Sequence, residues 1–554
     1  MKNSLSLSPL SLAVFGILAS LSAAAVAQTA PALDTIVVSG SRSETKLSET
    51  PVSIGAVSRA QWDADKPKSV GEIINRIPGV FWNDLGNEQH SMAIRQPIST
   101  NAVYQYLEDG IPIRPLGVFN HNALNENNMN GSGGVEVVKG AASSLYGSNA
   151  VGGAVNFLTQ RPSRTPTGYV GIRHDNTDGF TRVDSGASNT WGDLGLRFSH
   201  YSSQRDTNNW QQYSGGKKDS FTLRGDYNLS DKSWLRASLV HTNLDSDTPG
   251  SLFENDFRNN PGKSINTFTW RKDKTTRANL AWEGETTQGG LTTVTLFARN
   301  NDHGQLPNYT ISGCAGATCK GTLNNNHVES LGVDVKHEQK LDWLRARLVT
   351  GVYIDRSQND YVSDNLRVVR EVKDDGSTAR HISYTLNSVA NPSGVRNYGA
   401  GIANDALFAQ LEFSPSEQIR VVAGGRYDSI RYDFKNNLTP GANYGAANEV
   451  RSFAKFSPKL GATYALSPSS SLYSNLSMGF TPPEVSQLYG KTAIPELNSA
   501  TYDNVEVGWR ALLASGIRLD SALYQLSGKD TIVSYTSEIG DSFIKNAGNT
   551  RSRG

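Results

Sequence analysis

The sequence predicts an all-β fold, a transmembrane antiparallel β-barrel, from three observations. From residue 163 onward, apolar and polar residues alternate along many segments, as in strands with one apolar and one polar face. Short turns such as Ser414–Glu417 and long polar stretches such as 245–265 and 302–328 separate these segments, which is typical of a barrel with turns at one end and loops at the other. Beyond the first thirty residues, no apolar stretch is long enough for a membrane helix, and the mean hydropathy is −0.43.

The composition excludes several functional classes. The net charge is +1 and no run of like charges occurs, so the sequence does not imply nucleic acid as a partner. It contains no G-x-S-x-G turn, no histidine–glutamate zinc motif and no phosphate-binding loop. We therefore expect no enzyme and no cofactor. A hydrolase with catalytic groups at inward strand ends stays open but has no positive support.

Residues 1–27 are typical of a secretory signal peptide. Lys2 supplies the positive start, Leu12–Leu21 the apolar core, and Ala25–Ala27 the small-residue cleavage site. A buried N-terminal helix fits less well, because the apolar run stops at the small residues. We expect an exported protein whose first mature residue is Gln28.

The next segment, 28–49, contains a short run of β-branched residues. The run comprises Asp34, Thr35, Ile36, Val37 and Val38. An isolated extended segment cannot satisfy its own backbone, so it is suited to joining the edge of another protein's sheet. On composition alone, an ordinary first strand is the simpler interpretation.

Residues 50–162 predict a mixed α+β domain. Ser69 is placed to cap a short helix with isoleucines on one side, which Pro78 and Gly79 would stop. Asp109–Gly110 is a tight-turn dipeptide between two extended runs and predicts a hairpin.

The most informative stretch is Val135–Pro162, VEVVKGAASSLYGSNAVGGAVNFLTQRP. It resembles the end of the plug domain of TonB-dependent outer-membrane receptors. The residues that match the family motif are Glu136, Gly140, Ser144, Leu145, Tyr146, Gly147, Gly152, Gly153 and Asn156. Ala141 stands where the family has proline, a small departure.

Further motifs follow in the family's order. Within the plug region they are Ile77–Val80, Ile94–Gln96 and Leu107–Pro112, and in the barrel region Gly424–Asp428, Phe456–Leu460, Gly479–Pro483 and Leu488–Gly490. The resemblance implies a plug domain, 50–162, inside the lumen of a barrel of the 22-stranded type, 163–554. Because so few residues follow the plug, and no aromatic C-terminal strand is present, we expect an incomplete barrel that lacks its C-terminal strands.

The resemblance also implies a function. It is TonB-dependent active transport of a ferric siderophore, or a similar iron chelate, across the outer membrane, with Asp34–Val38 as the TonB box that binds the periplasmic protein TonB. The protein would span the lipid of the outer membrane. Haem receptors carry a histidine between two motifs that correspond to Phe480–Pro483 and Pro495–Leu497, and none occurs here. A signalling receptor would need an additional domain before Asp34.

Two alternatives remain open. One is TonB-dependent uptake of cobalamin or another non-iron nutrient. The other is a passive porin-like channel, which would need neither the 34–38 segment nor a plug.

Ligand-binding candidates lie on the predicted plug. They are Arg95, Gln96, Tyr104, Tyr106, Arg114, Asn120 and His121. Arginine suits carboxylate or catecholate oxygens because its planar donors pair with them, and aromatic rings offer flat contact area for large chelates. Internal ion pairs and core packing are the competing interpretations of these residues.

The only two cysteines, Cys314 and Cys319, lie five positions apart in a segment rich in glycine and asparagine. In an oxidising compartment they predict a loop-closing disulfide. A metal site would need more ligands than the nearby His303 and His327, so we expect none. Trp234, Tyr464 and Trp509, near predicted strand ends, are candidates for aromatic girdles at the membrane interfaces.

Overall fold

The structure is a computed structural model. It describes residues 36–37, 39–40, 42–374, 378–386, 396–441, 444–513, 517–536 and 542–554. The expected signal peptide lies outside the described residues, as do Asp34, Thr35 and Val38.

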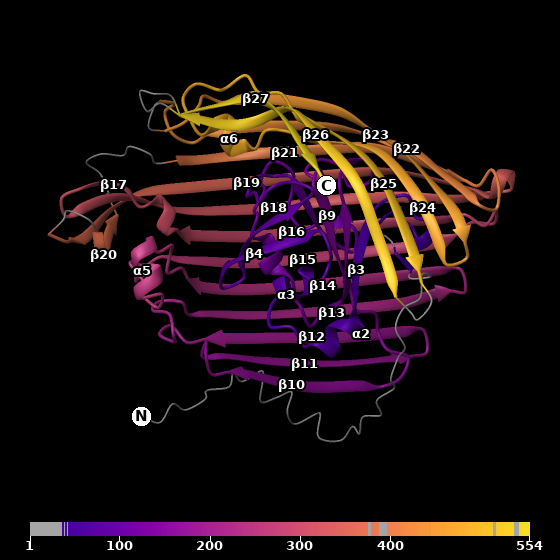
Figure 1. The fold of residues 1–554 in the computed structure, drawn as a ribbon, viewed down its shortest axis with the longest axis horizontal. Coiled ribbons are helices and arrows are strands. Elements are labelled where there is room, and N and C mark those ends of the chain that lie inside the picture. Colours follow the sequence, from indigo (N-terminus) through magenta and orange to yellow (C-terminus); the bar gives the residue numbers. More distant parts are fainter. Residues whose placement is uncertain are drawn as a thin grey trace.

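A single antiparallel sheet of eighteen strands, β10 to β27, forms the larger part of the described chain (Figure 1). The strands follow one another in chain order, while β16 also pairs with β18 and β19 with β21. Their bounds are β10 Thr167–Asp175, β11 Phe180–Trp191, β12 Leu194–Arg205, β13 Gly216–Ser230, β14 Ser233–Asp247, β15 Trp270–Glu285, β16 Leu291–Leu306, β17 Ser312–Ala315, β18 Thr318–Leu341, β19 Ala346–Val372, β20 Thr378–Leu386, β21 Arg396–Phe413, β22 Ile419–Asn436, β23 Glu449–Ser467, β24 Ser470–Thr481, β25 Ala500–Leu512, β26 Arg518–Thr536 and β27 Ser542–Arg553. The predicted all-β class is confirmed.

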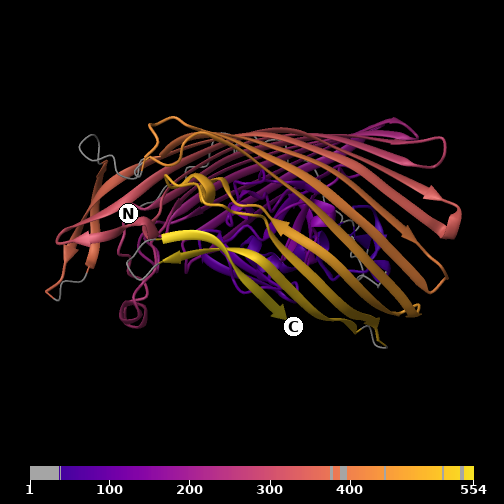
Figure 2. The same ribbon diagram turned by 90° about the horizontal axis from the view of Figure 1, so that it is seen from above.

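This sheet is curved and stays open in the described residues, because β10 and β27 end the strand order without pairing with each other. Figure 2 shows the sheet arching over the N-terminal domain, which lies on its concave side. The predicted arrangement of a plug domain within a barrel wall is confirmed at this level. Within the described residues, no helix has both the length and the apolar character that a membrane crossing requires.

Connections are short at one end of the wall and long at the other. Only residues 192–193 join β11 to β12, whereas 248–269 join β14 to β15 and contain helix α5 (Glu254–Asn259). The loop between β24 and β25 carries α6 (Val485–Tyr489). We call these the turn end and the loop end of the wall. The predicted long stretch 302–328 is mostly strand, since β16 runs to Leu306 and β18 starts at Thr318.

The two faces of the wall follow the predicted alternation. Along β13, Leu223 and Tyr227 are exposed on the outer face, while Ser220, Thr222 and Arg224 are buried on the inner face. An apolar outer face suits contact with lipid, and a polar inner face suits a filled lumen. Trp234, Tyr464 and Trp509 all lie at the turn end, and the side chains of the last two are exposed.

The N-terminal domain is built on a five-stranded sheet with the order β3-β8-β9-β6-β7, in which only β6 and β9 are parallel. Its strands are β3 Ile54–Ser58, β6 Tyr104–Glu108, β7 Ile111–Pro112, β8 Ser132–Lys139 and β9 Gly153–Thr159, with a separate hairpin of β4 Val80–Gly86 and β5 Gln89–Ile94. Its helical elements are α2 Arg59–Asp65, α3 Val70–Ile74, α4 Ser143–Tyr146, and the 3₁₀ turns η1 Leu47–Glu49 and η2 Ala123–Glu126. Two further 3₁₀ turns, η3 Asn308–Thr310 and η4 Trp343–Arg345, lie in the wall.

Local sequence explains these plug elements. The predicted helix is α3, with Ser69 at its N-cap position, but the Ser69 side chain makes no capping hydrogen bond. Ile73, Ile74 and Ile77 are buried as expected, although α3 ends at Ile74, before the predicted stop at Pro78. The predicted hairpin joins β6 to β7, where Asp109 and Gly110 both have positive φ, as a two-residue turn of this kind requires.

The paired glycines of the plug motif stand where the backbone is too crowded for a side chain. A Cβ at Gly152 would lie 2.8 Å from the carbonyl oxygen of Ile94, and one at Gly153 would lie 2.5 Å from that of Val138. Because these neighbours are backbone atoms, they cannot move aside cheaply. The glycines therefore let β9 start between β6 and β8.

Candidate functional site

A cavity of about 420 Å³ lies where the tip of the plug meets the loop end of the wall. The plug contributes residues 114 and 117–121, and strands β15, β16, β18, β19 and β21 contribute inward side chains. Its polar and aromatic lining includes Arg114, Asn120, His121, Arg271, His303, Gln305, Tyr309, Tyr361, Arg396, Tyr398 and Glu484. Three of the seven predicted ligand residues, Arg114, Asn120 and His121, are therefore brought together here.

Arg114 lies at the cavity but is engaged within the protein. Its Nε donates to Glu126 Oε1 at 2.8 Å, and its Nη2 contacts the same oxygen. Glu126 in turn accepts from Arg277 Nη1 at 3.2 Å, and Arg277 Nη2 reaches Glu108 Oε2 at 3.0 Å. This buried ion-pair network joins the plug to β15, as the competing interpretation of a plug arginine anticipates.

Among the arginines that line the cavity, Arg271 has donor atoms without a partner. Its side chain is buried, and Nη2 donates to Gln305 Oε1 at 2.8 Å. Its Nε and Nη1 are also buried, and no hydrogen-bond partner for them exists in the described part of the chain. Sequence reasoning missed Arg271, because only the register of β15 places it on the inner face, beside the outward Lys272.

Two histidines line the cavity, one from the wall and one from the plug. His303, on β16, is held through Nδ1 by a hydrogen bond to Asp273 Oδ1, and Asp273 also accepts from Asn125 Nδ2 at 3.1 Å. His121 lies on the plug, and its carbonyl oxygen accepts from the Tyr106 hydroxyl at 3.2 Å. Burial lowers the pKa of His121 to about 4, with a smaller contribution from the positive charge of nearby Arg271.

The rim near α6 adds a buried carboxyl group and aromatic surface. Glu484 Oε2 accepts the backbone N–H of Phe119 at 2.7 Å, and burial raises the pKa of Glu484 to about 7. The rings of Tyr361 and Tyr398 stack with centroids 5.0 Å apart. Asn120 Nδ2 is buried and finds no partner in the described ranges.

The remaining predicted ligand residues do not line this cavity. Arg95 forms an ion pair with Glu506 of β25 at 2.9 Å and lies over the ring of Tyr524. The Tyr104 hydroxyl donates to Met92 O at 3.1 Å, and Gln96 lies close to Gly152. Tyr106 does not line the cavity itself, but its hydroxyl donates to the carbonyl oxygen of His121 and its ring packs against Phe119, both of which do.

The N-terminal segment is anchored at the turn end. Ile36 and Val37 form β1, which pairs with Lys46 and Thr45 of β2 (Thr45–Lys46), and Val37 is buried. Ser39 makes three hydrogen bonds within the plug. Its backbone N–H donates to Glu136 Oε2 at 2.7 Å. Its hydroxyl oxygen accepts from Asn156 Nδ2 at 2.9 Å, and its carbonyl oxygen accepts from the Tyr146 hydroxyl at 3.1 Å. The two described residues of the expected TonB box are thus paired within the plug.

The same segment is bound to the wall. Arg42 forms an ion pair with Asp334 of β18 at 2.7 Å, and Lys336 Nζ donates to Arg42 O at 2.7 Å. Both side chains of the Arg42–Asp334 pair are nearly buried. Lys459 of β23 donates to Gly40 O at 3.1 Å.

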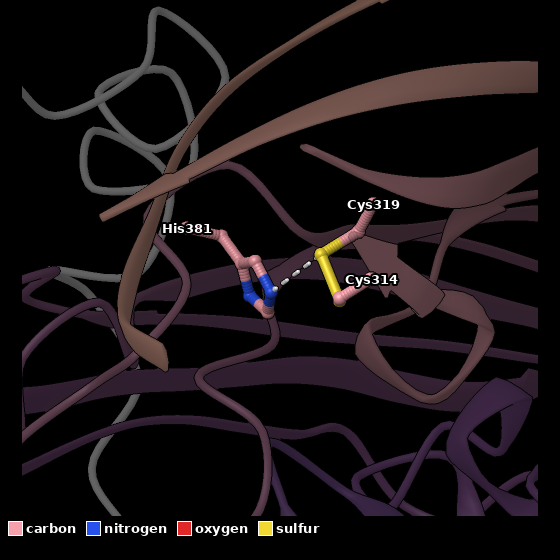
Figure 3. A group of neighbouring side chains, drawn as sticks. All are labelled: Cys314, Cys319 and His381. Carbon is pink, nitrogen blue, oxygen red and sulfur yellow. Dashed lines mark hydrogen bonds between the residues drawn. A yellow bond between two sulfur atoms is a disulfide. The ribbon is translucent and has the colours of Figure 1, made fainter. Parts of the chain in front are cut away.

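The two cysteines are joined by a disulfide at the loop end, between β17 and β18 (Figure 3). His381 of β20 faces it, with Nε2 3.8 Å from Cys319 Sγ and Nδ1 2.7 Å from Asn266 Oδ1. The histidines considered from the sequence are elsewhere: His303 is in the cavity and His327 hydrogen-bonds to Asp302 at 2.6 Å. His381 was missed because it is distant in sequence from both cysteines.

Several solved structures share this fold. An unliganded structure of the ferric citrate transporter FecA has a TM-score of 0.74 at 16% identity, covering 92% of this chain and 74% of that one. The pyoverdine outer membrane receptor FpvA from Pseudomonas aeruginosa PAO1 has a TM-score of 0.71 at 16% identity, covering 92% and 75%. The siderophore receptor PiuA from Acinetobacter baumannii has a TM-score of 0.69 at 14% identity, covering 92% and 76%.

Sequence comparison identifies related proteins as well. The vitamin B12 transporter BtuB of Vibrio vulnificus (strain CMCP6) is 31% identical over 137 residues, which make up 24% of this chain and only 22% of that protein. The family model for the TonB-dependent receptor plug domain matches residues 46–154, and the model for the TonB-dependent receptor-like β-barrel matches residues 119–554. The chain therefore belongs to the family of TonB-dependent receptors.

Proposed function

We propose that this protein imports an anionic iron chelate, a ferric siderophore or a similar complex, across the outer membrane with energy supplied through TonB. The observation that carries the proposal is the pair of unused, buried donors on Arg271 at the cavity. A buried charged group is costly unless hydrogen bonds satisfy it. An anionic ligand in the cavity would supply the missing acceptors.

The cavity chemistry favours carboxylate or catecholate oxygens. A guanidinium presents planar donors in a fork that matches such oxygens, and a charge-assisted hydrogen bond of this kind is roughly twice as strong as a neutral one. The stacked rings of Tyr361 and Tyr398 add flat contact area at the same cavity. Ferric citrate and pyoverdine, named for two of the structural relatives, are ligands of this anionic kind.

The plug and the N-terminal segment support active rather than passive transport. The plug lies on the concave side of the wall, where a porin-like channel would need open space (Figure 2). Ile36 and Val37 form a strand of only two residues, so a partner sheet could take them over at the cost of few hydrogen bonds. In this proposal the segment 34–38 binds TonB in the periplasm, after export directed by residues 1–27.

The second candidate function is uptake of cobalamin or another non-iron nutrient. Its support is the identity of 31% over 137 residues to a vitamin B12 transporter. Because the match covers only 22% of that protein, it does not extend to most of the wall.

Uptake by cells that produce the protein tests both candidates. A panel of radiolabelled ferric siderophores, ferric citrate, haem and cobalamin would be supplied, and accumulation inside the cells measured. We expect accumulation of an anionic iron complex. Accumulation of cobalamin alone would move the function to the second candidate, and accumulation of none of these compounds would contradict the proposal.

A matched pair of variants tests the cavity itself. Arg271→Gln should weaken binding of the transported iron complex by about tenfold to a hundredfold, since a hydrogen bond to a charged group contributes about 1.5–3 kcal/mol. Lys272→Gln, one residue along β15 and 56% exposed on the outer face, should leave binding unchanged. Equal affinities of the two variants and the native protein would show that the ligand binds elsewhere.

A further inference from the structure

We infer that the cavity takes metal complexes that leave coordination positions open, and that the imidazoles of His121 and His303 fill those positions. The inference rests on the proposed function and specifies the class of chelate. It predicts that the protein contacts the metal itself, in addition to the organic ligand around it.

His303 is prepared as a metal ligand by its neighbours. Its Nδ1 is hydrogen-bonded to the carboxylate of Asp273, which is the arrangement that orients most metal-binding histidines and raises their basicity. Asn125 of the plug holds the other oxygen of Asp273 at 3.1 Å. The remaining ring nitrogen of His303, Nε2, makes no hydrogen bond in the described residues and is free for a ligand.

His121 approaches the same cavity from the plug. Its backbone is held by the Tyr106 hydroxyl, while its ring makes no hydrogen bond to any described residue. Two imidazoles from different domains therefore line one cavity. Imidazole is a suitable ligand for iron, nickel, copper and zinc.

Arg271 gives evidence for a ligand that is independent of the two histidines. Its side chain is 4% exposed, it lines the cavity, and two of its donor atoms are unpartnered. Its open donors would pair with an anion, in addition to the attraction of nearby Asp273, whereas the imidazoles would bind a metal with free positions. An anionic chelate with too few donor atoms to saturate its metal could bind both Arg271 and the imidazoles. A fully saturated anionic complex could bind Arg271 only.

Two sources could present this chemistry: a small chelate of low denticity, or a planar metalloporphyrin with carboxylate side chains. Both leave metal positions open and both are anionic. Iron protoporphyrin, with metal-free protoporphyrin as its control, distinguishes the second source.

The test compares two nickel complexes on the full-length protein purified in detergent. Nickel nitrilotriacetate leaves positions open, whereas nickel EDTA is saturated by its chelator. We expect the nitrilotriacetate complex to bind at least about tenfold more tightly in calorimetry, with a shift of the nickel absorption bands as nitrogen ligands enter. Charge cannot produce this preference, because the EDTA complex carries the greater negative charge and Arg271 would favour it.

Variants assign the effect to the two histidines. His121→Gln and His303→Gln should each remove most of the preference and the absorption shift, while His327→Gln, on the outer face of β18, should change neither. Retained weak binding of the EDTA complex shows that each variant is folded, because that binding needs Arg271 but no imidazole.

The outcomes separate the inference from the proposed function. Equal affinity for the two complexes, lost in Arg271→Gln but not in the histidine variants, would overturn the inference and leave uptake of an anionic chelate standing. If iron protoporphyrin binds, neither nickel complex binds, and both histidine variants lose this binding, the result would support coordination by the histidines, with a metalloporphyrin as the ligand. No binding of any complex, together with no uptake of any iron chelate by cells, would overturn both.

Discussion

The plug meets the wall differently at its two ends. At the turn end, the N-terminal segment is held by Ser39, which makes three hydrogen bonds, and by Arg42, which forms an ion pair with Asp334. At the loop end, Arg271 and Asn120 keep buried donors that no described residue satisfies. The bonds to Ser39 and Arg42 hold the N-terminal segment within the protein, whereas the two donor groups at the loop end remain open to a ligand.

The energetic reason for the contrast is the cost of burying polar groups. A buried donor without a partner costs about 1–3 kcal/mol, and more when it is charged. Unpartnered buried atoms also occur elsewhere in the described residues, among them Arg95 Nε and Arg510 Nε, so it is the position of Arg271 at a cavity that points to a ligand. The satisfied end indicates anchoring, since each of its bonds must break before the segment can move.

The largest expected effect comes from a change at the turn end. Ile36→Pro removes the N–H that a partner sheet would use and resists strand pairing, so uptake should fall to background while binding at the loop end persists. Uptake and surface binding of the same labelled complex are measured in parallel. Ile36→Val, which keeps the N–H, should retain uptake.

Continued uptake by Ile36→Pro would refute coupling through this segment. Loss of both uptake and binding would mean that the two ends are not independent.

The second prediction concerns the anchor itself. Arg42→Ala leaves Asp334 nearly buried without its cation, and removal of one partner from a buried pair costs about 3–5 kcal/mol. Amide hydrogen exchange should accelerate over residues 39–50. Arg356→Ala breaks the exposed Arg356–Asp405 pair, whose side chains are 52% and 48% exposed, and should cost less than about 1 kcal/mol. Equal effects of the two changes would remove the evidence for an anchor.

The third prediction uses the pKa of Glu484 at the loop end. Burial raises this pKa from 4.5 to about 7, so the carboxyl group stays protonated in the folded protein while the unfolded chain ionises it. Glu484 therefore lowers the free energy of unfolding progressively as pH rises from 4.5 to about 7, and no further above that.

Ligand binding should follow the same group. An anionic ligand should bind about threefold to tenfold more tightly at pH 6 than at pH 8, because ionised Glu484 repels it. His121, with a pKa of about 4, does not titrate in this window. Glu484→Gln should flatten the pH profile, and an unchanged slope would show that another group controls it.

The smallest effect is expected from the disulfide. The double change Cys314→Ala and Cys319→Ala should speed hydrogen exchange locally, over residues 312–320, and alter ligand affinity by less than about twofold, because the loop it closes is short. Metal content, measured by mass spectrometry, should not change. A stoichiometric metal lost in the variant would favour a metal site that includes His381.

Local sequence was sufficient for several plug elements. The helix at α3 followed from the isoleucine spacing, although Ser69 does not cap it with its side chain, and the β6–β7 hairpin followed from Asp109–Gly110. Such features depend on neighbours within a few residues, so a pattern reveals them. Arg114, Asn120 and His121 were among seven plug residues selected for the chemistry of their side chains, and the other four do not line the cavity.

The residues that the wall contributes to the cavity could not be predicted from the sequence in this way. Arg271 and His303 lie on strands whose alternation is visible, but alternation alone does not say which inward residues face which part of the plug. Arg95 looked as promising as Arg114, and only its pairing with Glu506, far along the chain, shows that it is engaged elsewhere.

By itself, the sequence determined the all-β class, the order of plug before wall, and membership of the receptor family, because these depend on local periodicity and on motifs that are contiguous in the chain. Only the tertiary structure decided which polar groups are satisfied and which are left open. That outcome depends on the register of distant strands, such as β15 and β16, against the tip of the plug. Hydrogen bonding is directional and short-ranged, so a shift of one residue in β15 would turn Arg271 outward and place Lys272 in the cavity.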